Sequence, residues 1–228
     1  MLYSPIILVA GEPYGVFSEI FFKAIKQNKF KRPIILIVSE KLLINQMKAL
    51  KFKLKINIIR ENNLGLKKLN NKKINIINVN FNFKKTFDKI TNKSNNYIEN
   101  CFALGIKILK KKDCLGLING PISKRNFLKS KYFGITEYLA NKCGKENKVA
   151  MLIFNKKLSV SPITTHIPLK DVHKYITKEK IINHVKLIHD FYIKRLKINP
   201  RIAITGLNPH CESNYKSSEE DKIIKPAI

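Results

Sequence analysis

A histidine stands at the point where an apolar run gives way to a loop. His166 follows the segment 158–163, which has the pattern of a strand, and Pro168 soon prevents any regular continuation. A neutral imidazole can bind a metal ion or exchange a proton near neutral pH. Taken alone, a loop histidine bonded to its neighbours is the better interpretation, so the weight of His166 depends on what else can meet it.

A second histidine, His210, occupies an equivalent place in Gly206-Leu207-Asn208-Pro209-His210, after a predicted strand at 201–205. Two imidazoles from separate strand-end loops would form half of a metal site, since a catalytic zinc site needs about three protein ligands and an open position. His173 is equally well explained as a surface residue. His184 and His189 fall within a predicted long helix and are better interpreted as helix histidines with local partners.

The elements that must position these loops alternate along the chain. We expect strands at 6–10, 34–38, 56–59, 74–79, 114–118, 149–153, 158–163 and 201–205. We expect helices capped by Ser18 and Ser39, and others at 97–109, 136–142 and 178–196, while 81–96 shows no clear pattern. Continuous apolar strands alternating with helices predict an α/β fold with a largely parallel sheet, in two lobes.

Ligands of such folds bind beyond the carboxyl ends of the strands. Four loops qualify, at 11–15, 119–124, 164–171 and 206–210. Lys124 in the second loop could contact a phosphate or carboxylate, although an exposed lysine is the commoner explanation. We therefore assign it no firm role.

Composition narrows the classes of partner. The chain has 228 residues, 44% of them hydrophobic, enough for a substantial core. Its formal charge of +28 would ordinarily suggest nucleic acid. The lysines are instead spread through every segment together with many Asn and Ile residues, and no helix-turn-helix, zinc-finger, RNA-recognition or KH signature is present. We expect a solvated basic surface that could steer phosphorylated substrates, and no nucleic-acid partner.

Cysteine usage and the N-terminus bear on location. The four cysteines, Cys101, Cys114, Cys143 and Cys211, show no CxxC spacing, which favours a reducing cytoplasm. The N-terminus lacks a basic region, and nowhere do 18 apolar residues occur together. We expect a cytoplasmic protein with no signal peptide and no membrane partner.

Several motifs now add up to a family resemblance. They are Gly-Pro-Ile-Ser-Lys at 120–124, Gly-Ile-Thr-Glu-Tyr-Leu-Ala at 134–140, Thr-Thr-His-Ile-Pro-Leu-Lys-Asp-Val at 164–172 and Gly-Leu-Asn-Pro-His at 206–210. In residues, order and spacing they resemble the 4-hydroxythreonine-4-phosphate dehydrogenase family. The segment 11–16 resembles the opening loop of that family, and Glu219-Glu220 resembles its acidic pair after the second histidine.

The resemblance implies a two-lobed fold like isocitrate and isopropylmalate dehydrogenases, with lobes at 1–118 and 119–228, and a homodimer with its site at the subunit interface. It implies oxidation of 4-phosphohydroxy-L-threonine by NAD or NADP, assisted by a divalent metal such as Zn, Mg or Co, followed by decarboxylation on the route to pyridoxal phosphate. By the same resemblance His166 and His210 are metal ligands and Thr136 binds substrate. Catalytic and cofactor-binding residues stay unassigned.

Three departures from the family pattern affect these expectations. Ile135 replaces a histidine and cannot hydrogen-bond a phosphate. The glycine-rich run after the second histidine becomes Cys211-Glu212-Ser213-Asn214 and is one residue shorter, so that loop must take another path. Phe17 and Ser18 stand where Gly and Pro are usual.

The family pattern continues beyond Ile228 with a third metal histidine, further substrate-binding residues and much of the nicotinamide site. We therefore expect an incomplete C-terminal part, as a fragment or a truncated copy, and no detectable NAD reduction by these 228 residues alone. Two alternatives to the biosynthetic dehydrogenase stay open. One is a dehydrogenase of a related phosphorylated four-carbon hydroxy acid, and the other is an inactive remnant or basic binding protein.

Overall fold

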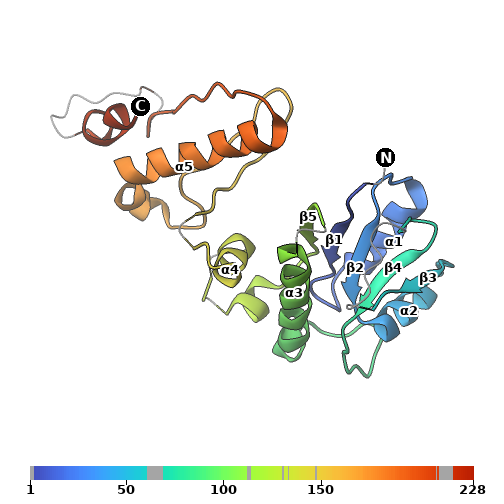
Figure 1. Cartoon of the computed structure of the whole chain (residues 1–228). Helices are drawn as coiled ribbons and strands as arrows, with labels where there is room; N and C mark the ends of the chain where they lie inside the picture. The colour runs from blue at the N-terminus through green and yellow to red at the C-terminus, as the bar shows by residue number, and fades with distance from the viewer. Residues whose placement is uncertain are drawn as a thin grey trace. The chain divides into compact units, whose positions relative to one another are not determined.

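The computed structural model describes residues 3–60, 69–111, 114–129, 131–132, 134–146, 148–208, 210 and 218–228. The chain forms two compact units, Met1–Ser130 and Lys131–Ile228, which are described separately (Figure 1). The lobe boundary expected between 118 and 119 stays a prediction.

The first unit is built on a five-stranded sheet in the order β3-β4-β2-β1-β5. Its strands are β1 (Ile6–Val9), β2 (Ile34–Val38), β3 (Ile56–Ile58), β4 (Ile74–Asn78) and β5 (Gly116–Asn119). Every pairing is parallel. The first five predicted strands are therefore confirmed to within two residues, as expected for apolar runs buried on both faces.

Helices cover the two faces of this sheet. α1 (Phe17–Gln27) and α2 (Glu40–Ala49) pack on one face, where Phe22 and Leu43 join Leu36 in a buried core. α3 (Asn95–Lys110) covers the other face, where it lies against β1, β2 and β5. Gly105 allows α3 to approach Val9 closely. A short 3-10 turn, η2 (Asn92–Ser94), leads into α3.

One of the two predicted helix caps is confirmed. Ser39 caps α2, because its hydroxyl accepts the N–H of Leu42 at 3.4 Å. The cap assigned to Ser18 is wrong, since α1 begins at Phe17 with Val16 as its N-cap and no side-chain cap. Phe17 is buried and stacks on Phe21 with ring centroids 5.7 Å apart, so aromatic packing starts this helix earlier than the cap signal indicates.

The second unit is mostly helical where it has regular structure. α4 (Ile135–Lys142) is followed by the 3-10 segment η4 (Leu169–Tyr175), then by α5 (Lys178–Phe191), which continues into the π-helical turn η5 (Tyr192–Leu196). The C-terminal segment forms η6 (Glu220–Ile224) and η7 (Lys225–Ala227). Another π-helical turn, η3 (Lys124–Leu128), ends the first unit. The predicted helices at 136–142 and 178–196 are confirmed.

The strands predicted at 149–153, 158–163 and 201–205 are wrong. The first two segments meet through one antiparallel bridge, between Ile153 and Val160, and no ladder extends from it among the described residues. The segment 201–205 is extended but unpaired. Ile163 and Ile204 pack instead on a small core around Ile181. An apolar run therefore marks burial here, and burial against a helix does not require strand pairing.

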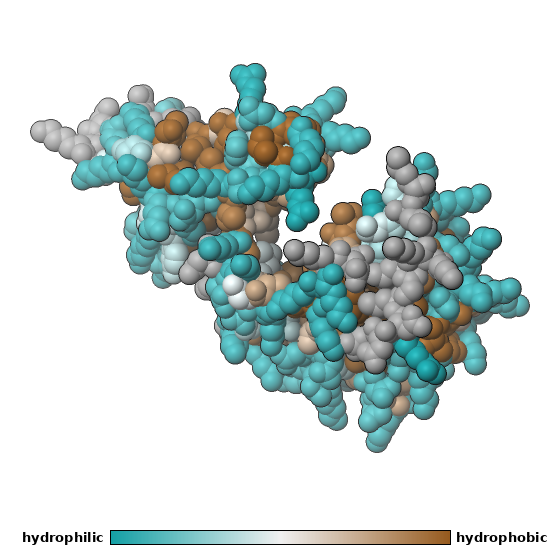
Figure 2. Space-filling model, viewed as in Figure 1, coloured by the Kyte–Doolittle hydropathy of each residue, from teal (hydrophilic) through white to brown (hydrophobic). Residues whose placement is uncertain are grey.

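On the face shown in Figure 2 most surface residues are hydrophilic, and apolar residues reach the surface in groups, one of them over the second unit. The hydrophilic residues are spread over the visible face and do not form a single stripe (Figure 2). No helix in the described part of the chain is long and apolar enough to cross a membrane.

Candidate functional site

The sheet of the first unit has a topological switch point beside β1. The chain moves from β1 to β2 through α1 on one face, and reaches β5, on the other side of β1, after α3 on the opposite face. Loops that leave neighbouring strands in opposite directions open a crevice at the carboxyl edge. The loops after β1 and β5 are two of the four that the sequence singles out.

These two loops are in direct contact through backbone atoms. The N–H of Glu12 donates to the carbonyl oxygen of Pro121 at 2.9 Å. Gly11 has φ +78°, and a Cβ there would lie 2.3 Å from that same oxygen. A Cβ on Gly120 would lie 2.2 Å from the carbonyl oxygen of Ala10. Only glycine allows the two loops to come this close.

Glu12 is a buried acid that sequence reasoning missed. Its carboxylate accepts the hydroxyl of Ser94, which lies 3.1 Å and 3.3 Å from the two oxygens. Burial raises the pKa of this carboxyl, and the Ser94 hydrogen bond opposes the shift. An acid between Gly11 and Pro13 in a strand-end loop is the signal that could have identified it. Lys124, in contrast, is exposed at the start of η3.

In the second unit, His166 lies beside the turn that begins α4. A Cβ placed on Gly134 would be 3.5 Å from Cδ2 and 3.6 Å from Nε2 of His166, and 3.0 Å from Oε2 of Glu137. The hydroxyl of Thr165 donates to Oε1 of Glu137 at 3.4 Å. His166 also has a positive φ of 56°, which is uncommon for a residue with a Cβ. Two of the predicted motifs, 134–140 and 164–172, therefore meet.

Thr136 lies in the first turn of α4, between Ile135 and Glu137, and is half-buried. Its neighbour Ile135 is half-buried too. The substrate contact predicted for Thr136 stays a prediction. Thr136 is adjacent in sequence to Glu137, whose carboxylate accepts the hydroxyl of Thr165, the residue before His166.

His210 is exposed, and its backbone N–H donates to Oδ1 of Asn208 at 2.9 Å. The loop before it is attached to the acidic pair, because the N–H of Leu207 donates to Oε1 of buried Glu220 at 3.1 Å. Pro209 and 211–217, including the departure at Cys211 to Asn214, lie outside the described residues. A role for Glu220 as an anchor was not among the sequence predictions.

The stems of the two histidine loops share one core. Ile163, before His166, and Ile204, before His210, both pack against the buried cluster of Ile176, Ile181 and Ile224. His184 has the local partner predicted for a helix histidine, whereas a local partner for His189 stays a prediction. His184 is buried with Nε2 2.7 Å from the Ser161 hydroxyl, and His189 is exposed.

The residues around His166 fit a divalent cation by their chemistry. An exposed imidazole supplies nitrogen, and Oε2 of Glu137 is a buried carboxylate oxygen without a hydrogen-bond partner in the described structure. The described residues contain no group of three or more His, Cys, Asp and Glu side chains arranged to hold an ion. Joint binding of one metal by His166 and His210 thus stays a prediction.

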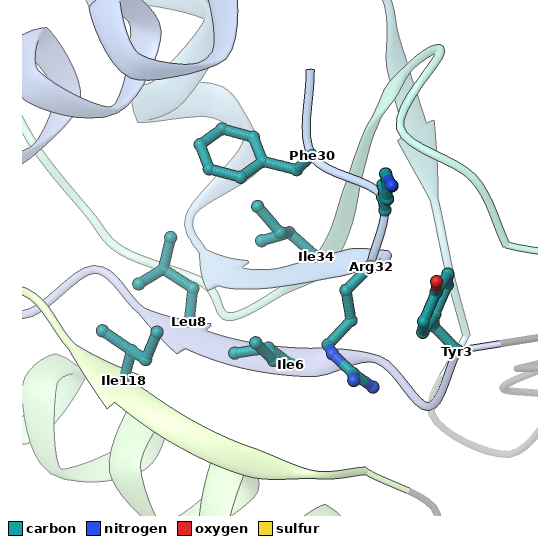
Figure 3. Close-up of a pocket in the computed structure, with 8 residues that line it drawn as sticks. Tyr3, Ile6, Leu8, Phe30, Arg32, Ile34 and Ile118 are labelled. Carbon is teal, nitrogen blue, oxygen red and sulfur yellow. The ribbon is translucent and has the colours of Figure 1, made fainter. Parts of the chain in front are cut away.

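A pocket of about 410 Å³ lies elsewhere, over β1, β2 and β5 (Figure 3). It is lined by Tyr3, Ile6, Leu8, Phe30, Lys31, Arg32, Ile34 and Ile118. Most of these side chains are apolar, and Tyr3 and Arg32 precede the strands. The pocket therefore lies toward the amino ends of the strands, away from the crevice loops, and contains no acid or histidine.

Fold and site together define an α/β protein whose candidate ligand-binding loops follow parallel strands and whose histidine-bearing loop lies on a second unit. The sequence model for the family described as pyridoxal phosphate biosynthetic protein PdxA matches residues 29–228. A 4-hydroxythreonine-4-phosphate dehydrogenase of Sulfurihydrogenibium sp. is 39% identical over 228 residues, covering 97% of this chain and 68% of the relative. One from Aquifex aeolicus is 31% identical, with coverage of 97% and 68%.

A solved structure agrees on the fold. The 4-hydroxythreonine-4-phosphate dehydrogenase of Klebsiella pneumoniae superposes with a TM-score of 0.84 at 22% identity, covering 99% of this chain and 70% of that chain. The chain belongs to the PdxA family of pyridoxal phosphate biosynthetic proteins. The family resemblance inferred from the four loop motifs, and the α/β fold it implied, are confirmed.

Proposed function

We propose that this protein oxidises 4-phosphohydroxy-L-threonine with NAD or NADP to 2-amino-3-oxo-4-phosphooxybutanoate, which then loses carbon dioxide during pyridoxal phosphate synthesis. Relatives that carry the name of this dehydrogenase and match nearly the whole chain support the proposal. In the oxidation the substrate carbinol loses hydride to the nicotinamide and its hydroxyl proton to solvent.

The single observation that carries the proposal is the contact between Gly134 and His166. It joins the helix turn that carries Thr136 to the loop proposed to bind the metal. His166 and His210 would hold a divalent ion such as Zn, Mg or Co. When bound, that ion polarises the substrate hydroxyl and eases its deprotonation.

The side chains of this chain have positioning roles in the proposed reaction. Thr136 donates its hydroxyl to the phosphorylated substrate from the first turn of α4, where backbone N–H groups also favour an anion. The lysine-rich surface raises the local concentration of the anionic substrate. Lys124 is assigned a weaker role than Thr136 in substrate binding, as a cationic side chain that can contact phosphate or carboxylate. No described residue is assigned to the nicotinamide.

We also propose a homodimer in the cytoplasm. The four cysteines of the chain show no CxxC spacing, as suits a reducing compartment. Analytical ultracentrifugation of the purified protein tests the dimer, and a monomer at micromolar concentration would contradict it.

The experiment is an absorbance assay of nicotinamide reduction, using the protein as its gene encodes it, with 4-phosphohydroxy-L-threonine and added divalent metal. We expect turnover that a chelator abolishes and that Thr136→Ala lowers about tenfold or more in kcat/KM, because a hydrogen bond to a charged group is lost. Thr205→Ala, at an exposed position of the same unit, is the matched control. The absence of turnover with intact folding would contradict the proposal.

A second candidate is supported by Ile135. An apolar, half-buried side chain before Thr136 removes one hydrogen-bond donor that phosphate recognition in the family pattern would use. The alternative is therefore a dehydrogenase of another phosphorylated four-carbon hydroxy acid. Comparison of kcat/KM between 4-phosphohydroxy-L-threonine and the corresponding acids without the amino group separates the two functions.

A further inference from the structure

Glu137 makes two different contacts with its two carboxylate oxygens. Oε1 accepts the hydroxyl of Thr165 at 3.4 Å, which connects the first turn of α4 to the residue before His166. Oε2 is buried and has no hydrogen-bond partner among the described residues. A buried carboxylate oxygen without a partner loses hydration that nothing replaces, so its position calls for a ligand or a proton donor.

The imidazole of His166 borders the same space as Oε2 of Glu137. The hypothetical Cβ of Gly134 lies 3.0 Å from Oε2 of Glu137 and 3.6 Å from Nε2 of His166, so both atoms border the space that this glycine leaves open. The same ring edge carries Cδ2, at 3.5 Å. The carboxylate and the Nε2 edge of the ring therefore face one small volume.

The backbone of His166 fits such a constraint. Its φ of 56° is in the left-handed region, which is unfavourable for a residue with a Cβ and persists where surroundings hold it. Thr165, the preceding residue, is tied to Glu137, and Gly134 lies against the ring itself. One carboxylate thus holds the residue before the histidine through Oε1, while its Oε2 borders the same space as the ring.

We propose that Glu137 is a positioning residue for His166, with Oε1 anchoring Thr165 and with Oε2, which has no hydrogen-bond partner in the described structure, accepting the Nε2–H of the ring when Nδ1 binds a divalent ion. The proposal rests on the metal role of His166 in the proposed function. A carboxylate behind a ligating histidine fixes its tautomer and raises its basicity, and removal of such a partner typically costs about 10- to 100-fold in metal affinity.

The test is calorimetric titration of Zn²⁺ and Co²⁺ into the metal-free protein as its gene encodes it. We expect Glu137→Gln, which keeps the shape and removes the charge, to weaken the affinity about 10- to 100-fold. Glu137→Asp should recover part of that loss. The control is Glu146→Gln on the same unit. Its exposed carboxylate accepts a hydrogen bond from the side-chain amide of Asn141 at 2.9 Å, near the C-terminal end of α4. It should leave the affinity within about twofold.

A spectroscopic measurement separates positioning from a general loss of structure. Long-range ¹H–¹⁵N spectra should give an Nε2–H tautomer for His166 in the wild-type protein and a shifted ring resonance in Glu137→Gln, while circular dichroism stays unchanged. Thr165→Val, which removes only the Oε1 anchor, should weaken metal binding less than Glu137→Gln.

Three results would overturn the proposal. Equal affinities of wild type and Glu137→Gln would remove the role of Glu137 and leave the metal role of His166 standing. An equal loss in Glu146→Gln would show a general charge effect instead. A wild-type protein that binds neither ion would refute this proposal together with the metal part of the proposed function, whereas metal binding without turnover would refute only the proposed oxidation.

Discussion

The backbone N–H of Leu207 donates a 3.1 Å hydrogen bond to Oε1 of Glu220, a residue that is 4% exposed. This bond fastens the loop that ends at His210 to the segment that begins η6. Glu220 and the core residue Ile224 are the first and last residues of η6. The position of the loop therefore depends on the packing of the C-terminal segment.

Glu220→Ala should therefore detach this loop. We expect a loss of about 1–3 kcal/mol in the free energy of unfolding, because a buried acceptor disappears and Leu207 loses its partner. Metal affinity should fall as well if His210 is a ligand. Urea unfolding measures the first effect, with Glu219→Ala as the neighbouring control. Stability equal to that of wild type would contradict the anchoring role.

The close approach of the two crevice loops predicts different costs at two glycines with positive φ. Gly144, with φ +64°, has open space around its position, so Gly144→Ala should cost about 1–2 kcal/mol from backbone conformation alone. Gly11→Ala adds a clash with the Pro121 carbonyl and should cost about 1–3 kcal/mol more. Chemical denaturation of both variants checks the difference, and equal losses would argue against the contact.

The raised pKa of Glu12 predicts that the free energy of unfolding depends on pH. Its folded-state pKa is raised by burial, so the folded protein holds the proton more tightly than the unfolded chain. Stability from this group is present below the unfolded pKa and is lost as pH rises through the folded pKa. Relative to wild type, Glu12→Gln should therefore gain stability between about pH 4 and pH 7. Unfolding curves across that range measure it, and a constant difference would be the contrary outcome.

The lowered pKa of His184 predicts the opposite change of the free energy of unfolding with pH. Burial, and then the charge of Lys180, lower the pKa of its imidazole, so the unfolded chain binds a proton that the folded protein does not. Stability from this group is full above the unfolded pKa, near 6.5, and falls as pH drops through it toward the folded pKa. His184→Gln should flatten this dependence. Unfolding curves of the two proteins across that pH range measure the difference in slope.

Ile135→His tests the departure next to Thr136. If 4-phosphohydroxy-L-threonine is the substrate, a new donor at this position should lower its KM about tenfold or more, since a hydrogen bond to a charged group contributes about 1.5–3 kcal/mol. Ile135→Leu, which keeps the side chain apolar, controls for packing. If the histidine raises KM and the leucine does not, the site is adapted to a different acid.

Local sequence determined most of the first unit. The run 34–38 is apolar at every position and the run 74–79 at four of six, and such runs have few alternatives to a buried parallel strand. The same logic placed the crevice loops, because parallel strands bring their carboxyl ends to one edge. Similar runs in the second unit failed as strands, because Ile163 and Ile204 satisfy their burial by packing on a helical core.

The sequence by itself determined the family, the α/β class and His166 as a residue of interest, since these follow from residue types, order and spacing. Only the tertiary structure decided which groups meet. The left-handed backbone of Gly11 under the Pro121 carbonyl, the buried acid at Glu12 and the free oxygen of Glu137 beside His166 are contacts between segments distant along the chain. Such contacts depend on chain packing, for which residue spacing carries no direct signal.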